Sequence, residues 1–141
     1  MMMTTKKMIG RKMMSKSLEE LFEVQGENQR KMFKQGMYAG FASSELSDEV
    51  ALSGLPVDSP ALSSYHIQHL VSEIGEVLDA DKRWKNFRNE KYDKDAKVDE
   101  LADCFIVLMN ICMFSDIDAA DFENAVVNKL ETVKERIEQN N

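Results

Sequence analysis

Apolar residues recur at helical spacing in four segments, and one segment shows the pattern most clearly. Its apolar positions follow the i, i+3, i+4, i+7 rule and are Ile67, Leu70, Val71, Ile74, Val77 and Leu78. Such a stripe predicts a helix that packs one face on a core. Ser59 and Pro60 are a capping residue followed by a first-turn proline, so we predict a helix from Pro60 to Phe87.

Two further helices are predicted towards the ends of the chain. One covers residues 18–35, with Ser17 as its N-cap and Glu20 as the capping-box partner. The other covers residues 118–138 and is opened by Asp118, an acidic residue of the kind that stabilises a helix N-terminus.

The remaining helix, over residues 96–114 with Asp95 as its cap, is apolar on nearly every side. We expect it to be buried. Its apolar residues are Leu101, Phe105, Ile106, Val107, Leu108, Met109, Ile111 and Met113. Residues 41–60 are rich in Ser, Gly and Pro and predict a long loop. Because no strand pattern or repeat competes, residues 17–141 are predicted to form one all-α domain, a four-helix bundle.

Charge is distributed unevenly around a net value of −7. Residues 1–16 hold five basic residues and no acid, and we interpret them as a disordered basic tail. The rest of the chain is therefore more acidic than the total, which argues against binding to duplex DNA or RNA.

The cysteines and the apolar runs indicate the cellular environment. Cys104 and Cys112 lie eight residues apart without a CxxC motif, so we expect reduced thiols in a cytoplasmic protein. The longest apolar run, residues 104–114, is interrupted by Asn110 and is too short to span a bilayer, so no membrane partner is expected.

Two pairs of acids carry the candidate chemistry. Glu73 and Glu76 lie one turn apart beside an apolar stripe, and Glu100 and Asp103 repeat this spacing in the most apolar helix. Like charges are costly to bury without a partner, and residues 98–128 contain no Lys or Arg. Facing helices would bring the four carboxylates together as ligands for Mg²⁺ or Mn²⁺.

A di-iron bundle is the competing interpretation of these acids. Its hallmark is a His three residues after a Glu, whereas His66 and His69 precede Glu73. We therefore interpret the histidines as satisfied or as supporting the ligands. Magnesium on carboxylates usually implies a phosphate substrate, and we assign Glu76, beside Glu73, as the residue that positions or deprotonates water.

Several cations are candidates for phosphate contacts. Lys129 and Arg136 share the apolar face of the last helix, where each either extends to solvent or binds phosphate. Lys85 and Arg88 belong to a basic cluster that either matches the dipole of a helix C-terminus or, with Trp84, contacts a nucleotide.

The acidic pairs resemble a known family. Ser72-Glu73-Ile-Gly-Glu76-Val, Arg-Trp84-Lys85 and Asp99-Glu100-Leu-Ala-Asp103 are similar to the paired metal motifs of the all-α NTP pyrophosphatase superfamily, which includes MazG-like enzymes, dimeric dUTPases and dCTP pyrophosphatases. This resemblance implies a MazG-like bundle, assembled as a dimer or higher oligomer. It also implies Mg²⁺-dependent conversion of a nucleoside triphosphate, dUTP or dCTP for example, to the monophosphate and pyrophosphate.

The resemblance extends to residues that would contact the substrate. Gln25-Gly-Glu-Asn28 is similar to the Gln-x-x-Asn that contacts uracil in dimeric dUTPases. Independently of the resemblance, Asn110 lies two turns beyond Asp103 on the same face, where it either supplies an amide near the site or is a core amide bonded to a neighbouring backbone. The last helix departs from the family, because Val133 stands where relatives often have Asn. The alternative interpretation is a non-catalytic helical oligomer or nucleotide-binding module whose acids are only solvated.

Overall fold

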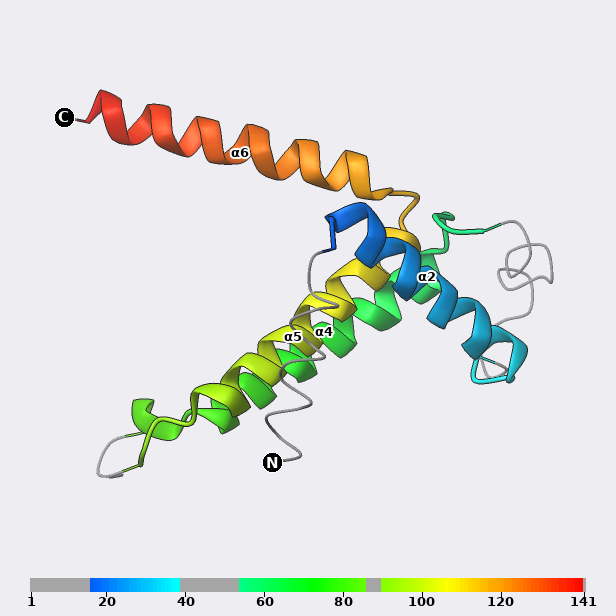
Figure 1. Cartoon of the computed structure of the whole chain (residues 1–141), viewed down its shortest axis with the longest axis horizontal. Coiled ribbons are helices and arrows are strands. Elements are labelled where there is room, and N and C mark those ends of the chain that lie inside the picture. The colour runs from blue at the N-terminus through cyan, green and yellow to red at the C-terminus, as the bar shows by residue number, and fades with distance from the viewer. Residues whose placement is uncertain (1–15, 39–53, 86–89, 141) are drawn as a thin grey trace. The chain divides into compact units, whose positions relative to one another are not determined.

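The chain is helical through most of residues 16–38, 54–85 and 90–140, which this computed structural model describes (Figure 1). The helices are α2 (Leu18–Lys34), α4 (Pro60–Ala80), the short 3-10 helix η1 (Lys82–Trp84), α5 (Lys94–Met113) and α6 (Ala119–Gln139). The described residues contain no strand, only an isolated bridge between Asp58 and Ser115. The predicted all-α class is confirmed, whereas the four-helix bundle stays a prediction.

Part of the sequence lies outside this description. Three predictions fall wholly or partly outside the described residues. These are the basic tail over residues 1–16, except for residue 16, the part of the predicted loop (residues 41–60) that runs up to residue 53, and the candidate Arg88. In the described part, no helix combines the length and the hydropathy needed to cross a membrane.

Local side-chain chemistry sets the start of two helices as expected. The backbone N–H of Ser17 donates to Glu20 Oε1 at 3.2 Å, and the N–H of Glu20 donates to Ser17 Oγ at 3.2 Å, which completes the predicted capping box. Ser59 Oγ accepts from the N–H of Leu62, and Pro60 occupies the first turn of α4. Both predicted starts are confirmed.

Two other predicted boundaries are wrong. The helix that was expected to reach Phe87 ends at Ala80, because the carboxylate of Asp81 binds side chains instead: it accepts from Arg83 Nε at 2.7 Å and from Lys97 Nζ at 3.0 Å. The cap of α5 is Asp93 and not Asp95, since Asp93 Oδ1 accepts from the N–H of Ala96 at 3.0 Å.

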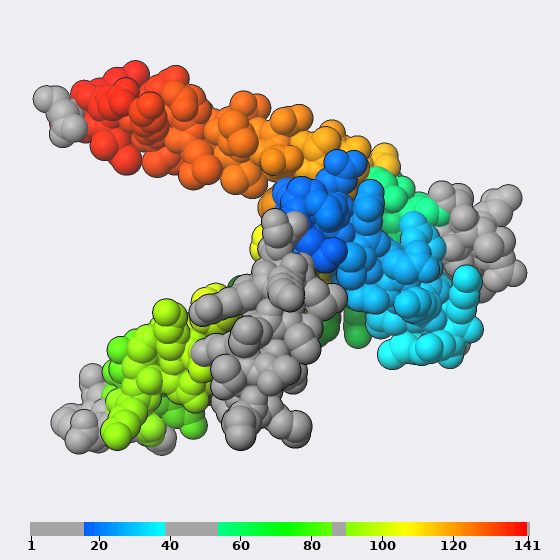
Figure 2. Space-filling model, in the orientation of Figure 1, coloured from blue at the N-terminus to red at the C-terminus, as the bar shows by residue number. Residues whose placement is uncertain are grey.

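The described residues divide into two compact units, residues 16–24 with 119–140 and the described part of residues 25–118. In the first unit, the rings of Phe22 and Phe122 pack at a tilt of 39° with their centroids 6.4 Å apart. In the second, α4 and α5 pack side by side, and their side chains meet near η1 (Figure 2). The second unit has a core around Tyr38, Leu62 and Phe114.

The expectation that the apolar helix is buried on every side is wrong for half of α5. Val107, Met109, Cys112 and Met113 are buried in its C-terminal part, but Leu101 in the N-terminal part is 50% exposed. Among the described residues of the second unit, α4 packs on one side of the N-terminal turns of α5, and the other apolar faces of these turns are exposed.

Candidate functional site

Three carboxylates from two helices converge in the second unit. Glu73 and Glu76 come from α4 and Glu100 comes from α5, and each offers one oxygen that lies within 4.8 Å of the oxygens of the other two. The i, i+3 spacing places the α4 pair on one face, and the packing of α4 on α5 brings Glu100 opposite them. The structure therefore brings together three of the four predicted ligands.

The chemistry of this cluster fits a hard divalent cation. Glu73 Oε2 and Glu100 Oε2 are buried and have no hydrogen-bond partner among the described residues. Desolvation, and then the nearby carboxylate of Glu76, raise the pKa of Glu100 above its ordinary value. An all-oxygen cluster of anions with unpaired buried oxygens matches the ligands that Mg²⁺ and Mn²⁺ prefer.

The fourth predicted ligand, Asp103, lies outside this close set. Its side chain is exposed, one turn beyond Glu100 on α5, and its charge contributes to the raised pKa of Glu100. Asp103 and Glu73 both line the pocket that adjoins the cluster. A residue at this position would face both a cation held by the cluster and a ligand in the pocket.

One histidine supports a ligand of the cluster. His69 Nε2 lies 3.0 Å from Glu73 Oε1, so the imidazole holds that oxygen in place and leaves Oε2 for another partner. A hydrogen bond from a neighbouring side chain is the usual way in which proteins orient a metal-binding carboxylate.

A pocket of about 300 Å³ lies beside the carboxylates and belongs wholly to the second unit. Its volume is at the small end of the range for small-molecule sites. It is lined by side chains from α2, α4, α5 and the turn after α2, namely Gln25, Gln29, Met32, Met37, Tyr38, Tyr65, His66, His69, Glu73, Asp103, Ile106, Val107 and Asn110. It combines apolar walls with a few convergent polar groups, as binding pockets do.

The polar groups of the pocket form one buried hydrogen-bond network around Asn110. Asn110 Oδ1 accepts from Gln25 Nε2 and from Gln29 Nε2, each at 2.9 Å. Asn28 Nδ2 in turn donates to Gln25 Oε1 at 3.2 Å. Gln29 and Asn110 are 1% and 4% exposed, so their amides are buried and held by each other.

Tyr38 and His66 continue the network on the far side of Gln29. The hydroxyl of Tyr38 donates to Gln29 Oε1, and His66 Nε2 lies 3.3 Å from the same hydroxyl. His66 stacks on Phe114 with the ring planes 5° apart. Burial, followed by the charge of His69, lowers the pKa of His66 to about 4, so the imidazole is neutral at pH 7.

The predicted substrate contacts are only partly brought together. Gln25, Asn28 and Asn110 meet in this network. Trp84 and Lys85 lie beyond the C-terminal end of α4 and do not line the pocket, and the indole N–H of Trp84 donates to the carbonyl of Leu78 at 3.1 Å.

The predicted phosphate contacts on the last helix belong to the other unit. Lys129 and Arg136 lie on α6 in the first unit, and both side chains are exposed. Val133, which stands at the usual Asn position, lies between them and is 49% exposed.

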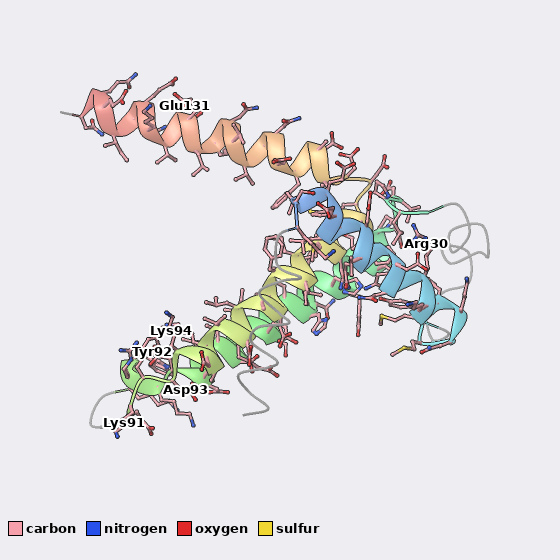
Figure 3. The ribbon with its side chains drawn as sticks, viewed as in Figure 1. Arg30, Lys91, Tyr92, Asp93, Lys94 and Glu131 are labelled. Atoms are coloured by element: carbon pink, nitrogen blue, oxygen red, sulfur yellow. The ribbon has the colours of Figure 1, made fainter. Side chains whose placement is uncertain are left out.

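Basic and aromatic residues gather at the η1 end of α4 and α5. Arg83 lies 3.9 Å from the ring centroid of Tyr92, while Lys91 and Lys94 flank this tyrosine (Figure 3). Two of the cations, Arg83 and Lys97, are paired with Asp81. These basic and aromatic contacts stabilise the connection between α4 and α5, and their residues do not line the pocket.

Sequence reasoning missed Gln29 and Tyr38 as members of the site. Gln29 is one turn from Gln25 on α2 and therefore shares its face, a signal that was available. Tyr38 follows the end of α2, and only the tertiary fold brings it to His66.

No family model, curated protein or solved structure matches this chain. The functional assignment therefore depends on the residues of the site themselves.

Proposed function

We propose that this protein is a Mg²⁺- or Mn²⁺-dependent nucleoside triphosphate pyrophosphohydrolase that acts on a pyrimidine deoxynucleotide. The observation that carries the proposal is the position of the Glu73, Glu76 and Glu100 cluster beside a small pocket with a polar, amide-lined wall. The cluster suits a metal with phosphates, and the pocket suits a small planar base.

Each carboxylate has a distinct part in this proposal. Glu73, Glu76 and Glu100 would hold the cation, and Asp103 would face it from the next turn of α5. A bound divalent cation would neutralise charge on the phosphate oxygens. Glu73 is tied to His69 and Glu100 is half-buried, whereas Glu76 is exposed. Glu76 is therefore the carboxylate best placed to orient water and to take its proton.

The proposed reaction is hydrolysis between the α- and β-phosphates. Water adds to the α-phosphorus while the bond from this phosphorus to the bridging oxygen breaks. The proton of the water passes to Glu76, and pyrophosphate leaves with the bridging oxygen. The nucleoside monophosphate remains in the pocket until it dissociates.

The motif resemblance to the all-α NTP pyrophosphatase superfamily supports the same reaction and implies self-association. Uncovered apolar residues on α4 and α5 are consistent with a dimer or higher oligomer: Val71 is 67% exposed and Ile74 is 51% exposed, and Ile74 and Leu101 line an apolar hollow. The two free cysteines suit the reducing cytoplasm.

Pyrophosphate release from a panel of NTPs and dNTPs, with Mg²⁺ and with EDTA, tests the proposal. We expect turnover of one or a few pyrimidine nucleotides, which EDTA abolishes and Glu76→Gln lowers by at least about 100-fold. Glu131→Gln on α6 makes the same chemical change at an exposed site and should leave the rate unchanged (Figure 3). A wild-type protein that binds Mg²⁺ but hydrolyses no nucleotide would favour a binding module instead.

A further inference from the structure

The hydrogen bonds around Asn110 have a direction, and this direction determines what the pocket can offer a ligand. Asn110 Oδ1 already accepts from Gln25 and from Gln29, so its oxygen is fully used. Its Nδ2 has no hydrogen-bond partner among the described residues, and Asn110 lines the pocket. The side chain therefore presents hydrogen-bond donors and no acceptor.

The same logic determines the proton on His66. The hydroxyl of Tyr38 gives its single proton to Gln29 Oε1, so His66 Nε2 must donate to the oxygen of that hydroxyl. In the neutral imidazole, Nδ1 is then an acceptor. This atom is buried and has no partner among the described residues, although His66 lines the pocket. Because His66 Nδ1 has almost no accessible surface, a ligand in the pocket meets the donor of Asn110 and not this acceptor.

The position of the carboxylates sets the orientation of a nucleotide in this pocket. Asp103 and Asn110 line the same pocket from α5 and lie seven residues apart, or about 10 Å at 1.5 Å per residue. If the phosphates bind at the carboxylates, the sugar extends from them into the pocket along α5. The edge of the base that lies farthest from the phosphates then reaches the buried Asn110. In a pyrimidine that edge carries the substituent at position 4 and the nitrogen at position 3.

We propose that this network makes the pocket select uracil, or another 4-oxo pyrimidine, over cytosine. Uracil presents an acceptor oxygen at position 4, which complements the donor of Asn110. Cytosine presents an amino group at position 4, so its contact with Asn110 would place a donor against a donor. This inference rests on the proposed function, since it uses the phosphates at the carboxylates to orient the base.

The residues of the network have different parts. Asn110 is a specificity-determining residue because it would touch the base. Gln29 and Tyr38 are positioning residues, because they act only by holding the amide of Asn110 in one orientation. A purely structural role of Tyr38 would change stability without changing the choice between bases.

The test compares kcat/KM for dUTP with kcat/KM for dCTP. We expect the wild-type ratio to favour dUTP by about 100-fold, since unpaired polar groups in a site reject a mismatched substrate strongly. Asn110→Asp keeps an oxygen for Gln25 and Gln29 but replaces the donor by an acceptor, so it should lower the ratio by about 100-fold or more. Asn128→Asp makes the same change at an exposed position of α6 and should leave the ratio unchanged.

A second variant protects the test against misfolding of Asn110→Asp. Tyr38→Phe removes the tie on Gln29 and should lower the dUTP-to-dCTP ratio by about tenfold while Mg²⁺ binding is unchanged. Calorimetric titration with the product monophosphates, dUMP and dCMP, gives a readout that needs no activity. The wild type should bind dUMP more tightly, and Asn110→Asp should reverse the order.

The outcomes separate this inference from the proposed function. Hydrolysis with a wild-type preference for dCTP, or with a ratio that Asn110→Asp leaves unchanged, overturns the inference and leaves the hydrolase standing. A preference for dCTP would mean that the amide network runs in the opposite direction. An absence of hydrolysis overturns the proposed function, and equal binding of dUMP and dCMP in the wild type then overturns the inference as well.

Discussion

The hydroxyl of Tyr38 is predicted to contribute to stability through two buried partners. Tyr38→Phe keeps the ring, which packs on Phe33 at a centroid distance of 4.6 Å, but removes the donor to Gln29 Oε1 and the acceptor for His66 Nε2. Gln29 and His66 are 1% and 3% exposed, so bulk solvent cannot replace the lost partner.

The expected cost follows from these two orphaned atoms. A buried polar atom without a partner costs about 1–3 kcal/mol, and water in the adjoining pocket can relieve part of this penalty. We therefore expect Tyr38→Phe to lower the free energy of unfolding by about 2 kcal/mol. At roughly 3–4 °C per kcal/mol for a chain of this size, the melting temperature should fall by about 6–8 °C.

Urea unfolding followed by circular dichroism measures this change. Tyr92→Phe is the matched control, because Tyr92 is 47% exposed and the same hydroxyl is removed at the surface. Its effect should stay within about 0.5 kcal/mol. If Tyr38→Phe were as mild as Tyr92→Phe, the buried network would not have the energetic role assigned to it.

Three further predictions address the pocket, the carboxylates and the helix. Burial lowers the pKa of His66 from 6.5 to about 4 in the folded protein, so between these pH values the unfolded chain takes up a proton that the folded protein does not. The free energy of unfolding should therefore fall by at most about 3 kcal/mol as the pH drops from 6.5 to 4. This part of the pH dependence should be missing in His66→Gln, measured by urea unfolding at pH 7 and at pH 4.5. Mg²⁺ at 100 times its Kd should stabilise the wild type by about 2.7 kcal/mol, which is measured as a rise in melting temperature. Glu100→Gln should lose most of that rise. An equal rise in both proteins would mean that the ion binds elsewhere. Gly26→Ala should raise the free energy of unfolding by up to about 1 kcal/mol, because Ala favours the helical conformation more than Gly does. The added Cβ would lie 3.7 Å from Met113 Sδ, which is an ordinary contact. A destabilised variant would mean that α2 cannot accept the methyl group.

Much of the helical organisation could be predicted because its causes are local. The caps of α2 and α4 depend on Ser17 and Ser59, whose bonds span three residues, and the apolar spacing marks each helix. The end of α4 could not be read in this way. It depends on Lys97, sixteen residues further on, which shares the carboxylate of Asp81 with Arg83.

In the site, too, features with local causes could be predicted and contacts between distant residues could not. The convergence of Glu73, Glu76 and Glu100 could be predicted from the sequence, because i, i+3 spacing places each acidic pair on one helix face and such faces can meet where the helices pack. The sequence did not indicate that Asp103 would lie outside this close set. The pocket was harder to predict from the sequence, because Asn110 accepts hydrogen bonds from two side chains that lie more than eighty residues earlier in the chain. A contact of that kind depends on the whole fold of residues 25–118.

The exposure of α5 shows a further limit. An apolar helix predicts burial, but the pattern does not say which surface covers it. Leu101 and Val98 remain about half exposed within this chain. Uncovered apolar residues of this kind are the feature that connects the fold to the proposed self-association.

Phosphorus NMR of dUTP incubated with the purified protein and Mg²⁺ tests the central claim most directly, because it identifies both products at once. The account predicts that dUMP and pyrophosphate appear in equal amounts, and that neither appears when EDTA is present. Formation of dUDP and inorganic phosphate would contradict the proposed site of cleavage. If neither dUTP nor any other nucleoside triphosphate were consumed by protein that binds Mg²⁺ at Glu73, Glu76 and Glu100, the carboxylate cluster would not be the centre of a pyrophosphohydrolase.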